Sequence, residues 1–101
     1  MTPSKETLKK YGLSEQEWNN ILHSQGGVCP ICKRVPSTGR FVTDHFHVKG
    51  FKKMTPDEKK KYVRGLPCTH CNRFYLAKGM TIEKAKNLMI YLTQYEERKP
   101  K

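Results

Sequence analysis

Two Cys-x-x-Cys pairs constrain this chain more than any other feature. Cys29 and Cys32 form the first pair, and Cys68 and Cys71 form the second. Each pair presents two thiolates from one tight turn, and zinc favours four thiolates in tetrahedral geometry. We therefore predict a structural zinc site made by all four cysteines. Such a closed site has no open coordination position, so we do not expect this zinc to be catalytic.

Redox chemistry is the alternative reading of the cysteine pairs. A redox motif needs one Cys-x-x-Cys at the start of a helix within an α/β pattern, and this chain has two pairs and no such pattern. His23 or His70 could replace a cysteine as ligand, but four cysteines already complete the zinc shell. The 101-residue length also favours zinc, because small domains often need a metal to stabilise a limited core.

The charge of the chain indicates its partner. Twenty Lys and Arg against nine Asp and Glu give a formal net charge of +11. Because neutralised phosphates release counterions, nucleic acid, and DNA in particular, is the expected partner, although a basic protein without this role has the same composition. We expect no membrane partner: there is no run of about 20 apolar residues to form a transmembrane segment, and an anionic membrane surface is the weaker alternative because no helix pairs a strongly basic face with a bulky apolar one. Residues 1–6 lack an apolar signal segment, so we expect a cytoplasmic protein with reduced thiols.

Local signals predict helices at both ends of the chain. Residues 2–4 begin a short helix that ends at Gly12, and Ser14 with Glu17 forms a capping box for a second helix. That helix places Trp18, Ile21 and Leu22 on one face and stops at residues 26–27.

Toward the other end, a helix is predicted from Asn72 to Gly79, and Thr81 caps a final helix. One stripe of this final helix is apolar, which fits either a core face or a dimer face; the positions are Ile82, Ala85, Leu88, Met89, Leu92 and Tyr95.

The middle of the chain predicts a hairpin. Residues 40–43 and 62–66 are rich in strand formers and each leads toward a functional motif. The connecting segment, residues 48–61, reads as an exposed lysine-rich loop with a single helical turn that starts at Thr55. It is either a solvated charge run or a loop that contacts DNA.

Asp44, His45 and Asn72 form a candidate catalytic constellation. Phosphodiester hydrolysis needs a base for water, which a histidine near neutral pKa can supply, and a hard cation held by oxygen ligands. Asp44 and Asn72 offer such oxygens, and His45 offers the base. Adjacent residues of a regular strand point to opposite faces, so Asp44 and His45 can serve one site only where the strand ends or bulges.

Several basic residues are candidate DNA contacts, each with a plain alternative. His47 could contact phosphate or be an ordinary surface histidine. Arg64 and Arg73 flank the proposed site and could grip the scissile phosphate, although Arg64 could equally be a surface strand residue. The loop supplies the remaining candidates, which are Lys52, Lys53, Lys59, Lys60 and Lys61.

These motifs together resemble a known family. The matching segments are residues 10–14, 25–32, 44–47 (Asp-His-Phe-His), 63–72 and the closing Tyr91-Leu92 helix. The chain resembles the phage recombination endonuclease VII family, within the HNH, or ββα-metal (His-Me finger), nucleases. The likeness covers roughly residues 8–95. It implies a phage or prophage gene.

The resemblance implies an α+β fold: a small zinc-stabilised ββα-metal core with flanking N- and C-terminal helices. We expect one domain over residues 1–101, with N-terminal helices in 1–27, the zinc-bound core in 28–79 and the C-terminal helix in 80–101. It also implies His45 as general base, Asp44 and Asn72 as ligands of catalytic Mg²⁺ or Mn²⁺, and 5′-phosphate products.

The sequence departs from the family pattern at three places. Phe46 replaces a frequent second acidic residue, the hairpin carries the lysine-rich loop, and Tyr75 stands where the junction-resolving member has a catalytic glutamate. These departures favour a compact DNA endonuclease, which could act as a homodimer, over a Holliday-junction resolvase. The other alternative is a non-catalytic zinc ribbon that binds nucleic acid and carries Asp44 and His45 incidentally.

Overall fold

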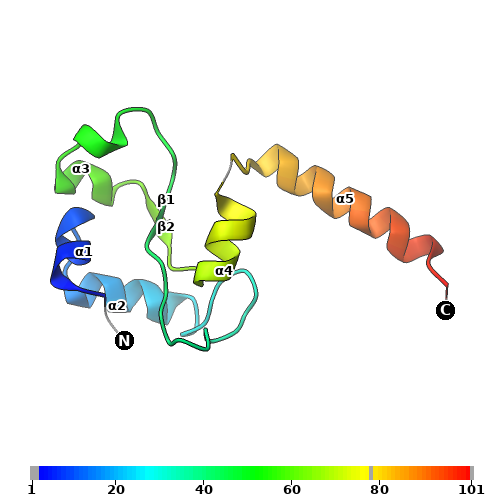
Figure 1. Cartoon of the computed structure of the whole chain (residues 1–101), viewed down its shortest axis with the longest axis horizontal. Coiled ribbons are helices and arrows are strands. Elements are labelled where there is room, and N and C mark those ends of the chain that lie inside the picture. Colours follow the sequence, from blue (N-terminus) through cyan, green and yellow to red (C-terminus); the bar gives the residue numbers. More distant parts are fainter. Residues whose placement is uncertain (1–2, 78, 101) are drawn as a thin grey trace.

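The computed structural model describes residues 3–77 and 79–100 and shows an α+β chain with a two-stranded sheet at its centre. In Figure 1, helices α1, α2 and α3 lie on one side of the strands, α4 lies on the other, and α5 extends away from the rest. The elements are α1 (Lys5–Lys10), α2 (Glu15–Ser24), β1 (Asp44–His45), η1 (Phe51–Lys53), α3 (Pro56–Lys60), β2 (Val63–Gly65), α4 (Thr69–Cys71), η2 (Asn72–Leu76) and α5 (Ile82–Arg98).

The hairpin predicted from the sequence is present, but its first regular strand begins later than expected. β1 pairs antiparallel with β2, whereas Phe41 makes only an isolated bridge with Cys68. Pro67 explains the interruption: it accepts a hydrogen bond from the Val42 N–H at 2.8 Å but has no N–H of its own to return. The prediction of a strand over residues 40–43 was therefore wrong in its bounds.

The pairing of the two strands contains an irregularity. Asp44 pairs with Gly65 and His45 with Val63, so β2 has one residue, Arg64, between these partners while β1 has none. Beyond it, the Phe46 N–H donates to the Tyr62 carbonyl at 2.7 Å. This β-bulge lies between Asp44 and His45, where the sequence argument required the strand to be irregular.

The N-terminal helices form as their caps predict. Ser4 and Ser14 cap α1 and α2, and Glu17 completes the capping box by accepting from the Ser14 N–H at 3.0 Å. Trp18 is 1% exposed at the centre of the main core, with Ile21 and Leu22 packed against that core. The other buried members of this core are Tyr11, Leu13, Phe51 and Leu66.

The lysine-rich loop is more ordered than an exposed charge run. Thr55 caps α3 as predicted, and η1 places Phe51 in the main core. Gly12, at φ +66°, approaches Pro56 so closely that an added Cβ would lie 2.4 Å from its carbonyl oxygen. The loop therefore covers the core and packs against the end of α1.

The second cysteine pair, Cys68 and Cys71, begins a helix earlier than the sequence predicted. Cys68 caps α4, and η2 continues it as a π-helix that starts at Asn72. The predicted start at Asn72 was therefore wrong by about one turn, because the Cys68 sulfur accepts the Cys71 N–H and so acts as the cap.

The closing helix α5 settles one of the alternatives for its apolar stripe. Thr81 caps it as predicted, but none of its residues is buried. Leu88, Met89 and Leu92 are 47%, 63% and 56% exposed. The stripe is therefore not a core face in this structure. None of the helices in residues 3–77 and 79–100 combines the length and apolarity that crossing a bilayer requires.

Candidate functional site

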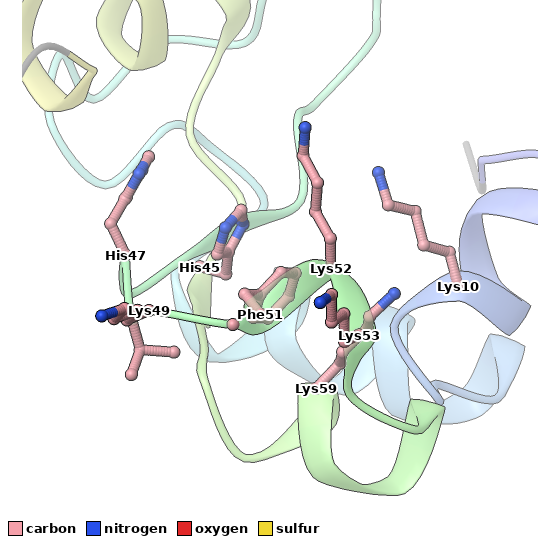
Figure 2. Close-up of a pocket in the computed structure, with 10 residues that line it drawn as sticks. Lys10, His45, His47, Lys49, Phe51, Lys52, Lys53 and Lys59 are labelled. Carbon is pink, nitrogen blue, oxygen red and sulfur yellow. The ribbon is translucent and has the colours of Figure 1, made fainter.

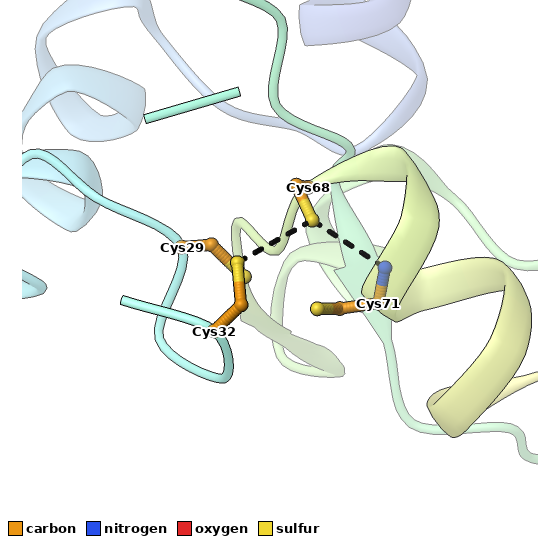
Figure 3. A group of neighbouring side chains, drawn as sticks. All are labelled: Cys29, Cys32, Cys68 and Cys71. Atoms are coloured by element: carbon orange, nitrogen blue, oxygen red, sulfur yellow. Dashed lines mark hydrogen bonds between the residues drawn. The ribbon is translucent and has the colours of Figure 1, made fainter. Parts of the chain in front are cut away.

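The two Cys-x-x-Cys pairs meet in one cluster. All four Sγ atoms lie within 4.8 Å of one another, and those of Cys32 and Cys68 are 3.9 Å apart (Figure 3). A tetrahedral zinc with bonds of about 2.3 Å separates its sulfur ligands by about 3.8 Å, so the cluster has the dimensions of a four-thiolate site. Cys29 and Cys71 are fully buried, and Cys32 is the most exposed of the four.

The pKa values of the Cys29 and Cys71 thiols are shifted in opposite directions. Burial raises the pKa of Cys29, but hydrogen bonds from backbone N–H groups and from the neighbouring Cys32 have a larger, opposite effect. The net result is a pKa lowered to about 6. Burial and the surrounding thiols raise the pKa of Cys71. Metal binding must therefore displace protons, most of all from Cys71, and zinc affinity should rise with pH.

His45 lies in a stack of rings. Its ring lies 3.9 Å from that of Phe51 at an interplanar angle of 11°, and 4.9 Å from that of His47 at 17°. Tyr11 lies at the edge of the group, with a centroid separation of 6.0 Å. Because Phe51 belongs to the core, the plane of the His45 ring is held by a fixed neighbour.

The surroundings of His45 favour its neutral form. Burial of the ring lowers its pKa first, and the nearby charge of His47 lowers it further. Lys10 and Arg64 act in the same direction, whereas the Asp44 carboxylate opposes them. The net effect is a pKa below the usual value of 6.5, which leaves an imidazole able to accept a proton at neutral pH.

Asp44 is 6% exposed and is paired with Arg64. The guanidinium donates from Nε to Oδ2 at 2.8 Å and from Nη2 to Oδ1 at 3.1 Å. Such a fork engages both carboxylate oxygens and is among the stronger hydrogen-bonded pairs in proteins. The sequence predicts Arg64 to be a phosphate contact or a surface strand residue; its pairing with Asp44 was not predicted.

Asn72 lies at the junction of α4 and η2, directly after the last cysteine of the cluster. Its side chain is half-buried. Within residues 3–77 and 79–100, no hydrogen bond joins it to Asp44 or His45. The second Cys-x-x-Cys turn positions Asn72, whereas the hairpin positions Asp44 and His45.

An open pocket of about 790 Å³ lies beside His45 (Figure 2). Lysines from α1, the loop and α3 surround it, and the amino groups of Lys10 and Lys52 point the same way in the close-up. The lining residues are Lys10, His45, His47, Val48, Lys49, Gly50, Phe51, Lys52, Lys53 and Lys59. The pocket thus combines one candidate base with a concentration of positive charge.

The structure separates the predicted basic residues into groups. His47, Lys52, Lys53 and Lys59 line the pocket, and Lys59 also lies over the Phe51 ring. Lys60 forms an ion pair with Glu17 of α2, and Lys61 is exposed outside the lining. Arg73 is exposed, with its guanidinium 5.7 Å from the Phe74 ring centroid.

Sequence reasoning missed Lys10 and Lys49 as pocket residues and Phe51 as the support of His45. Lys49 could have been included as a loop lysine next to His47. No local signal links Lys10 with the loop, because only the packing of α1 against α3 brings them together.

The fold and the site define a small α+β domain that has a four-cysteine cluster suited to zinc and a basic pocket beside a hairpin histidine. The chain belongs to the recombination endonuclease VII family, whose family model matches residues 4–95. The resemblance inferred from the motifs is thereby confirmed. The family is named for a recombination endonuclease.

Two phage proteins are similar to the chain. The Gene 59 proteins of Mycobacterium phages D29 and L5 are each 37% identical to it over 70 residues. The alignment covers 68% of this chain but only 36% of each relative, so the chain spans well under half the length of these proteins. No solved structure matches the chain.

Proposed function

We propose that this chain is a divalent-metal-dependent DNA endonuclease of the HNH (ββα-metal) type, formed by one domain over residues 1–101. It hydrolyses phosphodiester bonds and leaves 5′-phosphate ends. One observation carries the proposal: His45, with a pKa favouring the neutral form, borders an open lysine-lined pocket and directly follows the buried Asp44 carboxylate.

The oxygen atoms of Asp44 and Asn72 fit a catalytic Mg²⁺ or Mn²⁺. Carboxylate and amide oxygens are hard ligands of the kind that Mg²⁺ prefers, whereas the thiolates of the cysteine cluster suit zinc. When bound, the divalent cation supplies charge neutralisation at the phosphate and at the leaving oxygen. The role of Asp44 and Asn72 is to hold it beside His45, each from a separately stabilised element.

His45 is the proposed general base. A ring nitrogen of its neutral imidazole accepts the proton of the attacking water. Stacking on Phe51 restricts the orientation of the ring, so little reorganisation is needed when the proton moves. The pocket lysines and His47 hold phosphates of the DNA strand, and they contact its backbone without reading its sequence.

Plasmid nicking tests the proposed reaction. Supercoiled plasmid should become nicked or linear with Mg²⁺ or Mn²⁺, but not with EDTA, and His45→Ala should abolish this while zinc content and folding persist. His23→Ala is a matched control, since His23 is an exposed histidine of α2 away from the pocket. Its activity should equal that of the wild type.

The same assay tests the two alternatives. If neither wild type nor His45→Ala cleaves plasmid while both retain zinc and DNA, the non-catalytic zinc-ribbon module is the better description. If wild type cleaves four-way junctions strongly and linear duplex poorly, the resolvase subclass is favoured.

Salt dependence tests the DNA contacts. Each phosphate contact contributes about 0.9 to the slope of log K against log salt for duplex DNA. Lys52→Gln with Lys53→Gln should lower that slope by nearly two, because both residues line the pocket. Lys60→Gln with Lys61→Gln removes the same charge outside the pocket lining and should change the slope less. Equal slopes for the two double variants would remove the pocket from the proposal.

We also propose that two copies associate through α5. Its apolar stripe is exposed along the helix and does not contribute to either buried cluster of the described chain. A dimer would bring two active sites to one duplex, so that both strands could be cut in one binding event; a single site would need two events. Light scattering should give a dimer mass for wild type and a monomer mass for Leu88→Glu with Leu92→Glu. A monomeric wild type at micromolar concentration would contradict this.

A further inference from the structure

The pairing of Arg64 with Asp44 competes with metal binding by the Asp44 carboxylate. Asp44 is the proposed metal ligand, yet both of its carboxylate oxygens accept hydrogen bonds from one guanidinium. The carboxylate is 6% exposed, whereas the Arg64 side chain is 37% exposed and has a route to solvent. The partner that can move is therefore the arginine.

Charge makes it unfavourable for both cations to share this carboxylate. A guanidinium and a divalent cation on one carboxylate repel each other, and the pocket already holds Lys10 and other lysines. Without a metal, however, the buried Asp44 needs a counter-charge, because an unpaired buried carboxylate is strongly destabilised. The β-bulge supplies it by placing Arg64 between the partners of Asp44 and His45.

We propose that Arg64 is an internal counter-cation of Asp44, which Mg²⁺ or Mn²⁺ displaces when it binds. The inference rests on the proposed function, since it takes Asp44 as a metal ligand. Arg64 in this role is a positioning residue that holds both carboxylate oxygens of Asp44 in place before the metal binds. Its displacement frees a guanidinium near His45.

Metal binding by zinc-loaded variants tests the displacement. Mn²⁺ binding is followed by calorimetry and by the loss of the free Mn²⁺ electron-resonance signal, with zinc content and thermal melting recorded for each variant. Arg64→Gln removes the competitor and should bind Mn²⁺ roughly fivefold to tenfold more tightly, since a partly exposed charged fork is worth about that factor. Arg40→Gln removes the same charge away from Asp44 and should bind like wild type. Unchanged or weaker binding by Arg64→Gln overturns the inference.

A second measurement follows Arg64 in the wild-type protein. The Arg64 Nε–H should give a distinct NMR signal in the wild type, assigned by its absence in Arg64→Lys. Mg²⁺, which is diamagnetic, should move this signal toward the position of free arginine. A signal unchanged at saturating Mg²⁺ overturns the displacement.

Asp44→Asn distinguishes failure of the proposed catalytic metal site from failure of the Arg64 displacement. If wild type and Asp44→Asn bind Mn²⁺ equally, the proposed catalytic metal site fails and the inference falls with it. If Asp44→Asn binds more weakly but Arg64→Gln does not bind more tightly, only the displacement fails.

Discussion

The Gln25 side chain hydrogen-bonds the end of α2 to the segment that precedes Cys68. Its Nε2 donates to the carbonyls of Val28 at 3.0 Å and Leu66 at 2.7 Å, and its Oε1 accepts the Leu66 N–H at 3.1 Å. Leu66 is fully buried, and within the described residues its backbone groups hydrogen-bond only to Gln25. One side chain thus makes the two backbone hydrogen bonds of Leu66 that a neighbouring strand would otherwise supply.

Gln25→Ala should destabilise the protein by about 3 kcal/mol. The change leaves two buried backbone groups of Leu66 unpaired, and each such group costs about 1–3 kcal/mol. The lower half of that range applies, because some water can enter the space left by a half-buried side chain. For a domain of this size, the loss corresponds to a fall in Tm of about 12–24 °C.

Thermal and urea unfolding of zinc-loaded protein at one fixed free zinc concentration measure this effect, since bound metal also contributes stability. Gln16→Ala is the matched control, because Gln16 lies in α2, the helix that Gln25 caps, and its side chain donates to exposed Asn20. It should change stability by less than about 0.5 kcal/mol. A loss below about 1 kcal/mol for Gln25→Ala, or one equal to that of the control, would refute the reasoning.

Three further outcomes concern the site. Because His45 must be neutral to act as base and its pKa lies below 6.5, cleavage should decline only as the pH falls below that value, and Lys10→Gln should move the decline to higher pH in a pH–rate profile. Phe51→Leu keeps an apolar side chain but removes the stacked ring, so kcat should fall about tenfold with KM nearly unchanged; an unaltered kcat would count against ring orientation. Cys71→Ser should lose zinc by metal analysis and should melt far below wild type, since zinc binding contributes folding energy.

Features set by local chemistry could be predicted from the sequence. The two cysteine pairs predicted the four-sulfur cluster because each turn fixes two ligands and the metal preference fixes the rest. The Ser14 capping box and the caps at Thr55 and Thr81 were equally accessible, since a cap depends on residues within one turn.

Features set by long-range packing could not be predicted. Nothing near Gln25 or Lys10 in the chain indicates a contact with Leu66 or with the pocket. The Asp44–Arg64 pair depends on where the register of the hairpin slips, which no periodicity reveals. The apolar stripe of α5 has a helical period whether it is buried or exposed. Only the structure shows that it is exposed.

The single extra residue of β2 has a consequence for insertions and deletions. Side chains alternate between the faces of a strand, so a shift by one position reverses every face beyond it. Deleting Arg64 would leave Asp44 opposite Gly65 and His45 opposite Val63 in a regular ladder, which would turn Asp44 and His45 toward opposite faces of the sheet. Natural variation in chain length should therefore spare the segment from Val63 to Cys68.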